Sequence, residues 1–235
     1  MDLAAHWQKV EQRIQSACIR AQRDRADVSL VAVTKGHPPD TVRAAADLGH
    51  TLFGENKVQE AKAKIPLCPG RLQWHMIGHL QSNKCRDAVY FFQMIESVDS
   101  LELALELNKA ADKWSKTMPV LLEVNVVGEA SKFGFSPEQV LAQLDELNSL
   151  RRLEIHGLMT IAPWSPEPEK VRPVFRQLRE IKQDCEQRLG APLQHLSMGM
   201  SGDFEVAIEE GATIVRLGTA LFGPRSTARK MGQGV

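Results

Sequence analysis

The sequence predicts a (β/α)₈ barrel with an additional N-terminal helix, and two observations support this fold. Short apolar runs recur along the chain, and segments with helical periodicity separate them. Alternating strands and helices imply parallel strands joined by crossovers, and eight such units fit a closed barrel. The alternative is a doubly wound open sheet. That fold usually carries a glycine-rich turn after its first strand, where this chain has Lys35 and two prolines.

Eight apolar runs are the expected strands. Each is short and most are followed by an amphipathic segment, as the βα unit requires. In chain order they are Leu30–Thr34, Thr51–Phe53, Gln73–Ile77, Met94–Ser97, Val120–Asn125, Leu153–Met159, His195–Ser197 and Thr213–Leu217.

Helix signals stand before and between these runs. The opening stretch, from about Leu3 to Gln22, is predicted to be the additional helix. A later helix is predicted to begin at Ser136 as N-cap, with Pro137 in the first turn and Gln139 completing a capping box. Another is predicted to stop at Gly190, after the apolar positions Val171, Phe175, Leu178, Ile181 and Cys185.

Composition excludes several classes of protein. Lys+Arg and Asp+Glu balance at 29 each, so no net field attracts nucleic acid or an anionic membrane. The four cysteines are scattered without metal-site spacing and are expected to be reduced thiols. No secretion signal, membrane span or linker is apparent. We therefore expect a soluble cytoplasmic protein in which residues 1–235 form one domain.

Lys35 is the first candidate for chemistry. It follows the first apolar run and stands directly before Gly36-His37-Pro38-Pro39, where a strand ends in a turn. An amine at the mouth of a core is partly desolvated, which lowers its pKa and favours Schiff-base formation. The alternative is a lysine whose amine reaches solvent at the strand end.

The loops after the last two expected strands resemble phosphate-binding turns. They read Met198-Gly199-Met200-Ser201-Gly202-Asp203 and Gly218-Thr219. A glycine beside a hydroxyl presents backbone N–H groups to an anion, and barrels often bind phosphate at these two loops. The alternative is that Ser201 and Thr219 are ordinary N-caps.

A Schiff-base lysine and a phosphate site at one barrel mouth together indicate pyridoxal 5′-phosphate (PLP), which has an aldehyde at one end and a phosphate at the other. Arg216, at the end of the eighth run, is the candidate partner of the pyridine nitrogen. The alternative for Arg216 is a salt bridge at the strand end with Glu205 or Glu209.

Seven motifs along essentially the whole chain resemble the YggS/PROSC family of pyridoxal phosphate homeostasis proteins. They are Val31-Ala32-Val33-Thr34-Lys35, Phe53-Gly54-Glu55-Asn56, the run from Trp74 to Lys84, Lys132-Phe133-Gly134-Phe135, His156-Gly157-Leu158-Met159-Thr160, the run from Leu196 to Asp203, and Val215-Arg216-Leu217-Gly218-Thr219.

The resemblance implies a barrel of PLP fold type III, similar to the barrel domain of alanine racemase. It implies that Lys35 carries PLP as a reversible aldimine, that Ser201, Gly218 and Thr219 hold the phosphate, and that Arg216 faces the pyridine nitrogen. Asn56 and Met200 would line the cofactor, with His75, Ser197 and Gly199 as secondary candidates. The implied role is vitamin B6 and amino-acid/keto-acid homeostasis, with PLP and apo-PLP enzymes as partners.

The alternative is a small PLP enzyme such as an amino-acid racemase. A racemase needs a second base, a tyrosine from a C-terminal domain in alanine racemase. Tyr90, the single tyrosine, falls in a helix expected outside the barrel. We therefore expect no enzymatic turnover, no catalytic residue and a monomer. His75 and His79 have no evident third ligand, so no metal is expected.

Overall fold

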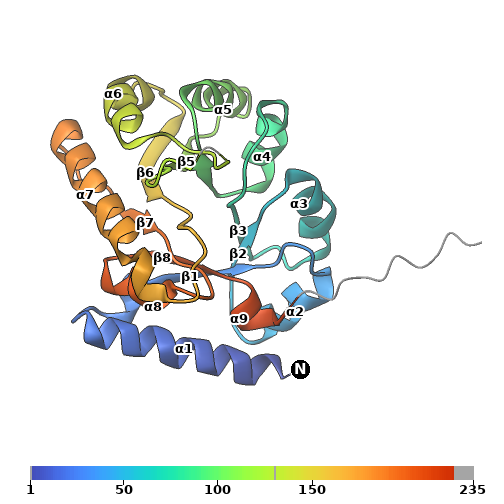
Figure 1. Ribbon diagram of the computed structural model, residues 1–235. Coiled ribbons are helices and arrows are strands. Elements are labelled where there is room, and N and C mark those ends of the chain that lie inside the picture. The colour runs from blue at the N-terminus through green and yellow to red at the C-terminus, as the bar shows by residue number, and fades with distance from the viewer. Residues whose placement is uncertain (1, 130, 225–235) are drawn as a thin grey trace, which may run out of the picture.

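The computed structural model describes residues 2–129 and 131–224. Its eight parallel strands form one closed barrel in sequence order, with β8 paired to β1 (Figure 1). The strands are β1 (Ser29–Val33), β2 (Leu52–Glu55), β3 (Gln73–Met76), β4 (Met94–Val98), β5 (Met118–Glu123), β6 (Leu153–Met159), β7 (His195–Ser197) and β8 (Ile214–Leu217). The predicted barrel is confirmed, and closure between β1 and β8 excludes the open sheet.

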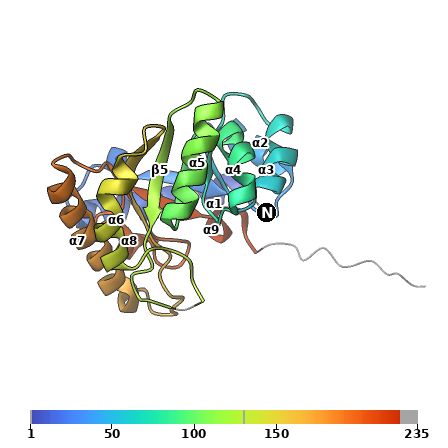
Figure 2. The same cartoon turned by 90° about the horizontal axis from the view of Figure 1, so that it is seen from above.

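Helices surround the barrel, as the view turned by 90° also shows (Figure 2). They are α1 (Leu3–Arg20), α2 (Pro39–Asp47), α3 (Val58–Lys64), α4 (Cys85–Phe91), α5 (Leu101–Lys113), α6 (Pro137–Asn148), α7 (Arg172–Leu189), α8 (Phe204–Glu209) and α9 (Thr219–Phe222). Short 3₁₀ turns cover Arg25–Asp27, Ile65–Leu67, Ser82–Lys84 and Pro168–Val171. None of the described helices combines the length and apolar character needed to cross a membrane.

Local signals located two helix ends correctly. Ser136 caps α6 in a full capping box with Gln139. Helix α7 ends at Gly190, whose φ of 64° is the left-handed conformation that glycine adopts most readily. The opening helix is two residues shorter than predicted, since it ends at Arg20 and Gln22 has a φ of 54°.

Several strand ends differ from the prediction by one or two residues, and contacts between distant segments accompany two of these differences. Strand β2 continues through Gly54, which pairs with Val33. A side chain at Gly54 would come within 2.7 Å of Val31 Cγ1 in the barrel interior, so the glycine serves the strand instead of ending it. Strand β5 ends at Glu123, and Val124 forms an isolated bridge with Phe135.

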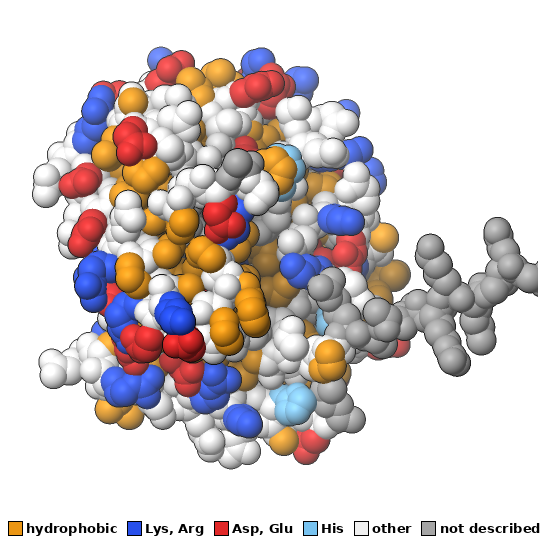
Figure 3. Space-filling model, viewed as in Figure 1, with side chains coloured by type: hydrophobic (Ala, Val, Ile, Leu, Met, Phe, Trp, Pro, Cys, Tyr) orange, Lys and Arg blue, Asp and Glu red, His pale blue; other side chains and the backbone are white. Residues whose placement is uncertain are grey.

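The apolar core has two parts. The larger lies between the outer faces of the strands and the helices, and includes Phe53, Trp74 and Phe175. The smaller fills the barrel and is made of Val31, Val33, Ile77, Met94, Leu121, Met159 and Ile214. Seen as in Figure 1, the molecular surface carries apolar side chains around its centre and charged ones toward its edges (Figure 3).

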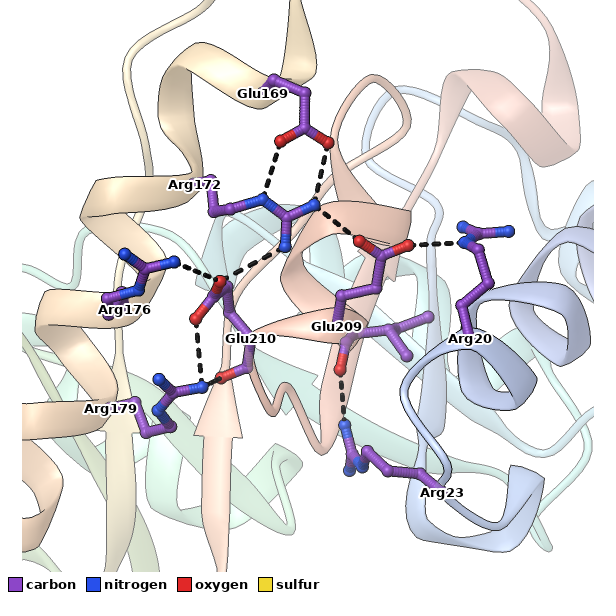
Figure 4. A network of polar contacts seen from close by, with 9 residues as sticks. Arg20, Arg23, Glu169, Arg172, Arg176, Arg179, Glu209 and Glu210 are labelled. Carbon is purple, nitrogen blue, oxygen red and sulfur yellow. Dashed lines mark hydrogen bonds and ion pairs between the residues drawn. The ribbon is translucent and has the colours of Figure 1, made fainter.

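An arginine–glutamate network holds α8 between α1 and α7 (Figure 4). Glu209, the last residue of α8, pairs with Arg20 of α1 at 2.7 Å and with Arg172 of α7 at 2.6 Å. Glu210 lies within 3.2 Å of Arg172, Arg176 and Arg179. Since the loop before α8 is one of the two phosphate-type turns, this network fixes the element that carries the loop.

Candidate functional site

A cavity of about 340 Å³ lies at the carboxyl ends of the strands and contains most of the predicted site residues. Its lining brings together the segments that follow β1, β2, β3, β6, β7 and β8. The lining residues are Val33, Lys35, Asn56, Ile77, Ile161, Trp164, Ser165, Met200, Ser201, Gly202, Asp203, Arg216, Gly218 and Thr219. All seven primary candidates from the sequence lie in this one cavity.

Lys35 is half-buried and stands two residues beyond the end of β1. The backbone on its N-terminal side is held to the barrel, because the Thr34 N–H donates to the Gly54 carbonyl at 3.1 Å. The next turn closes with the His37 N–H donating to the Thr34 carbonyl at 3.0 Å. The backbone around Lys35 is therefore held in place beside the cavity that Lys35 lines.

The loops after β7 and β8 form one anion-binding wall. The Ala220 N–H donates to Ser201 Oγ at 3.1 Å, which joins the two loops. Within the described residues, the backbone N–H groups of Ser201, Gly202, Gly218 and Thr219 donate no hydrogen bond. Donors without partners that line a cavity are suited to a phosphate group.

Gly218 and Asp203 shape this wall. Gly218 lets β8 pass close to β1, since a Cβ there would lie 3.3 Å from the Val33 carbonyl oxygen. Asp203 Oδ1 accepts the Met200 N–H at 2.6 Å and so closes the turn that contains Ser201. Burial raises the pKa of Asp203 above its ordinary value.

Arg216 forms part of the cavity wall and is held from behind by a buried polar network. Its guanidinium donates to the Thr160 carbonyl at 2.9 Å and to Ser197 Oγ. Ser197 Oγ in turn donates to Glu96 Oε2 at 2.5 Å, and Arg216 Nη1 lies 3.8 Å from the same oxygen. The alternative salt bridge with Glu205 or Glu209 is wrong: those residues pair with Arg13, Arg20 and Arg172.

Glu96 is the centre of that network and was missed by sequence reasoning. It is fully buried, and His75 Nδ1 donates to its Oε1 at 2.6 Å. Burial alone would raise the pKa of Glu96, but hydrogen bonds from His75 and Ser197 and the charge of Arg216 hold it below the ordinary value. The signal was a glutamate inside an apolar strand-forming run, which marks a buried charge in need of partners.

The three secondary candidates support the cavity without lining it. His75 and Ser197 bind Glu96 and position Arg216. Gly199 has a φ of 94°, its carbonyl accepts the Arg216 N–H at 3.0 Å, and a Cβ there would come within 2.6 Å of Ala207. These residues thus form the layer beneath the cavity.

Two buried polar groups near the cavity, Asn56 and Glu123, are in unfavourable surroundings. Asn56 Oδ1 is buried and lacks a partner in the described residues. Glu123, at the end of β5, lines an adjoining hollow together with Asn56, and burial raises its pKa to about 7. Unsatisfied or neutralised polar groups of this kind are common beside ligand sites.

The remaining sequence signals lie elsewhere. His79 does not join His75 in a metal site, since His79 binds Asp99 at 2.8 Å and stacks on Phe133. In the described part of the chain no group of three or more His, Cys, Asp or Glu side chains could hold a metal. Tyr90 is 58% exposed on α4 and contacts Phe91 and Trp114, so it lies outside the cavity as predicted.

The residues present fit PLP. The cavity lining contains a lysine, loops whose backbone N–H donors have no partner in the described residues, and an arginine held by the Thr160 carbonyl. An aldehyde, a phosphate and an aromatic nitrogen acceptor are the groups that such a set binds. A barrel with this site defines the class of alanine racemase-like PLP barrels, and the family model for the alanine racemase N-terminal domain matches residues 8–226.

Curated relatives define the family more narrowly. The pyridoxal phosphate homeostasis protein of Aquifex aeolicus is 43% identical over 96% of this chain and 99% of its own, and that of Pseudomonas aeruginosa is 44% identical over 95% and 96%. PipY of Synechococcus elongatus, solved with PLP bound, has a TM-score of 0.80 and 39% identity, covering 91% of this chain and 100% of PipY. The chain belongs to the family of pyridoxal phosphate homeostasis proteins, as the sequence motifs predicted.

An alanine racemase of Clostridium difficile shares the fold alone. Its TM-score is 0.70 at 17% identity, and the match covers 93% of this chain but 57% of the racemase. The likeness confirms the barrel type, and the function has to be argued from the site.

Proposed function

We propose that this protein binds PLP covalently and reversibly at Lys35 and takes part in vitamin B6 homeostasis. The observation that carries the proposal is the convergence of Lys35, Arg216 and the loops after β7 and β8 on one cavity. PipY, which is 39% identical, was solved with PLP bound, and this supports the same ligand here. The cofactor supplies an aldehyde that condenses with a lysine amine and releases water.

The chain's own residues are assigned as follows. Lys35 is the attachment point, and the N–H groups of Ser201, Gly218 and Thr219 bind the phosphate. Arg216 faces the pyridine nitrogen, with Asn56 and Met200 against the ring. Glu96, with His75 and Ser197, fixes the orientation of the Arg216 guanidinium.

The same residues favour a carrier over a racemase. An arginine is always charged, so Arg216 does not give the pyridine nitrogen a proton, and the ring remains a poor electron sink. Racemisation also needs a second base opposite Lys35. Apart from Lys35, the titratable side chains in the described cavity lining are Asp203 and Arg216, and both are committed to structural hydrogen bonds.

Two further points belong to the proposal. We expect the whole chain to act as one domain and a monomer, since the described residues complete one barrel; the ends of the predicted domain, Met1 and residues 225–235, lie outside the described part. Apo-PLP enzymes are the expected recipients, because a half-buried lysine at an open mouth is accessible to exchange.

Turnover distinguishes the two functions. The purified protein, saturated with PLP, is incubated with amino acids in deuterium oxide, and exchange at Cα is followed by NMR. We expect no exchange above that of the Lys35→Ala variant with free PLP. Exchange at an enzyme-like rate that depends on Lys35 would establish an enzyme and end the carrier proposal.

A further inference from the structure

A buried charge cluster from α3 lies directly behind Lys35. Lys64, the last residue of α3, has a side chain that is 5% exposed. Its ammonium group donates to the Thr34 carbonyl at 2.7 Å, to Glu55 Oε1 at 2.6 Å and to Glu60 Oε1 at 2.8 Å. An ammonium has three N–H donors, so every one of them is used.

The cluster forms hydrogen bonds with the backbone on both sides of Lys35. On the N-terminal side, the Thr34 carbonyl accepts a hydrogen bond from Lys64, and the Thr34 hydroxyl donates to Glu55 Oε1 at 2.7 Å. On the C-terminal side, the Gly36 N–H donates to Glu60 Oε1 at 2.6 Å. The two peptide groups that flank Lys35 are therefore tied to one cation and its two carboxylates.

Stability alone is a weak reason for such a cluster. Burying an ion pair costs desolvation that its attraction often fails to recover, and apolar side chains of similar size serve as well. Here Glu55 Oε2 is buried without a partner in the described residues, and burial raises the pKa of Glu55 despite Lys64. The cluster makes hydrogen bonds to both neighbours of Lys35 although burying its charges is costly. This indicates that its role is to fix the position of Lys35.

We propose that Lys64 and Glu60 are positioning residues for Lys35. They hold the turn that carries Lys35 so that its amine stays over the cavity, and they thereby set how long PLP remains attached. This inference rests on the proposed function and deepens it. No contact of Lys64 or Glu60 with the cofactor is involved, since neither residue lines the cavity.

Glu60 offers a clean pair of variants because its side chain is 28% exposed and lies in the first turn of α3. Glu60→Gln keeps an oxygen that accepts the Gly36 N–H, whereas Glu60→Ala removes it. Lys64→Met removes the cation and keeps the stem, and Lys62→Met, at an exposed lysine of the same helix, is the matched control.

The experiment follows loss of the bound-PLP absorbance after dilution into a trap for free PLP. Losing a hydrogen bond to a charged group corresponds to roughly a tenfold change in rate. We expect PLP release to be about tenfold faster in Glu60→Ala and at least about tenfold faster in Lys64→Met. In Glu60→Gln and Lys62→Met the release rate should stay within about twofold of that of the unsubstituted protein.

A second readout needs no cofactor. Hydrogen exchange of the Gly36 amide in the PLP-free protein should be faster in Glu60→Ala than in Glu60→Gln by a similar factor. Unchanged release in Glu60→Ala overturns the inference, even if amide exchange there is faster, because the amine then does not depend on the turn. If the unsubstituted protein fails to attach PLP at Lys35, the proposed function fails instead.

Discussion

At the scale of single residues, the site depends on polar groups whose partners are distant in sequence. Lys35, Ser201, Arg216 and Thr219 could be found from local signals, since each stands at a strand end beside a turn. Glu96 could not, because its contact with Ser197 joins residues 101 positions apart. A single sequence shows that a buried glutamate needs partners but does not show which ones.

Glu123 gives a prediction about pH at this scale. Burial raises its pKa to about 7 in the folded protein, against an ordinary value of 4.5. The folded state therefore keeps a proton that the unfolded state has lost, and stability falls as pH rises from about 4.5 to about 7. The loss is on the order of 3 kcal/mol.

Glu123→Gln removes this loss, because glutamine stays neutral at every pH. We expect the variant to be more stable than the unsubstituted protein by about 2 kcal/mol at pH 8 and no more stable at pH 4, by urea unfolding without PLP. Glu146→Gln, on the exposed face of α6, is the control. A Glu123→Gln variant that is equally or less stable at pH 8 would show that burial does not raise the pKa of Glu123 in the folded protein.

At the scale of elements, capping and glycine signals located the helices, and strand ends were harder. Ser136 and Gly190 act through neighbours within a few residues, so their effect could be read locally. Gly54 continues β2 because Val31 and Ile77 leave no room for a side chain, and those contacts exist only in the closed barrel. The bridge between Val124 and Phe135, just after β5, likewise joins residues that only the folded chain brings together.

The network around α8 gives the prediction for this scale. Arg172 binds both Glu209 and Glu210, which are largely buried, so Arg172→Met leaves them short of a partner. We expect a loss of about 2 kcal/mol in the free energy of unfolding at pH 7. Arg188, on the same helix as Arg172, forms an exposed ion pair with Asp145 of α6. Arg188→Met should therefore change the free energy of unfolding by less than about 0.5 kcal/mol.

The effect of Arg172→Met should also depend on pH. Burial would raise the pKa of Glu209 and of Glu210, but hydrogen bonds from the arginines hold both below the ordinary value of 4.5. Their contribution is complete above pH 4.5 and is lost as pH falls through the lower folded values. Thermal melts from pH 3 to 7 should show the variant and the unsubstituted protein converging in acid. A difference that stays constant would assign the loss to packing.

At the scale of the whole molecule, the barrel brings together six loops that are far apart in the chain. The order of strands and helices, with no glycine-rich turn after the first strand, predicted a closed barrel, and closure places the strand-end residues at one mouth. Which side chains enter the cavity and which lie beneath it required the structure. Trp164, 87% exposed yet part of the cavity wall, comes from a loop without any local signal.

The central claim is that one lysine at this mouth holds PLP. The most direct test is borohydride reduction of the PLP-treated protein, followed by digestion and mass spectrometry. The account predicts that Lys35 is the principal modified lysine and that Lys35→Ala loses the visible absorption band. Modification mainly at another lysine, or an unchanged band in Lys35→Ala, would contradict it.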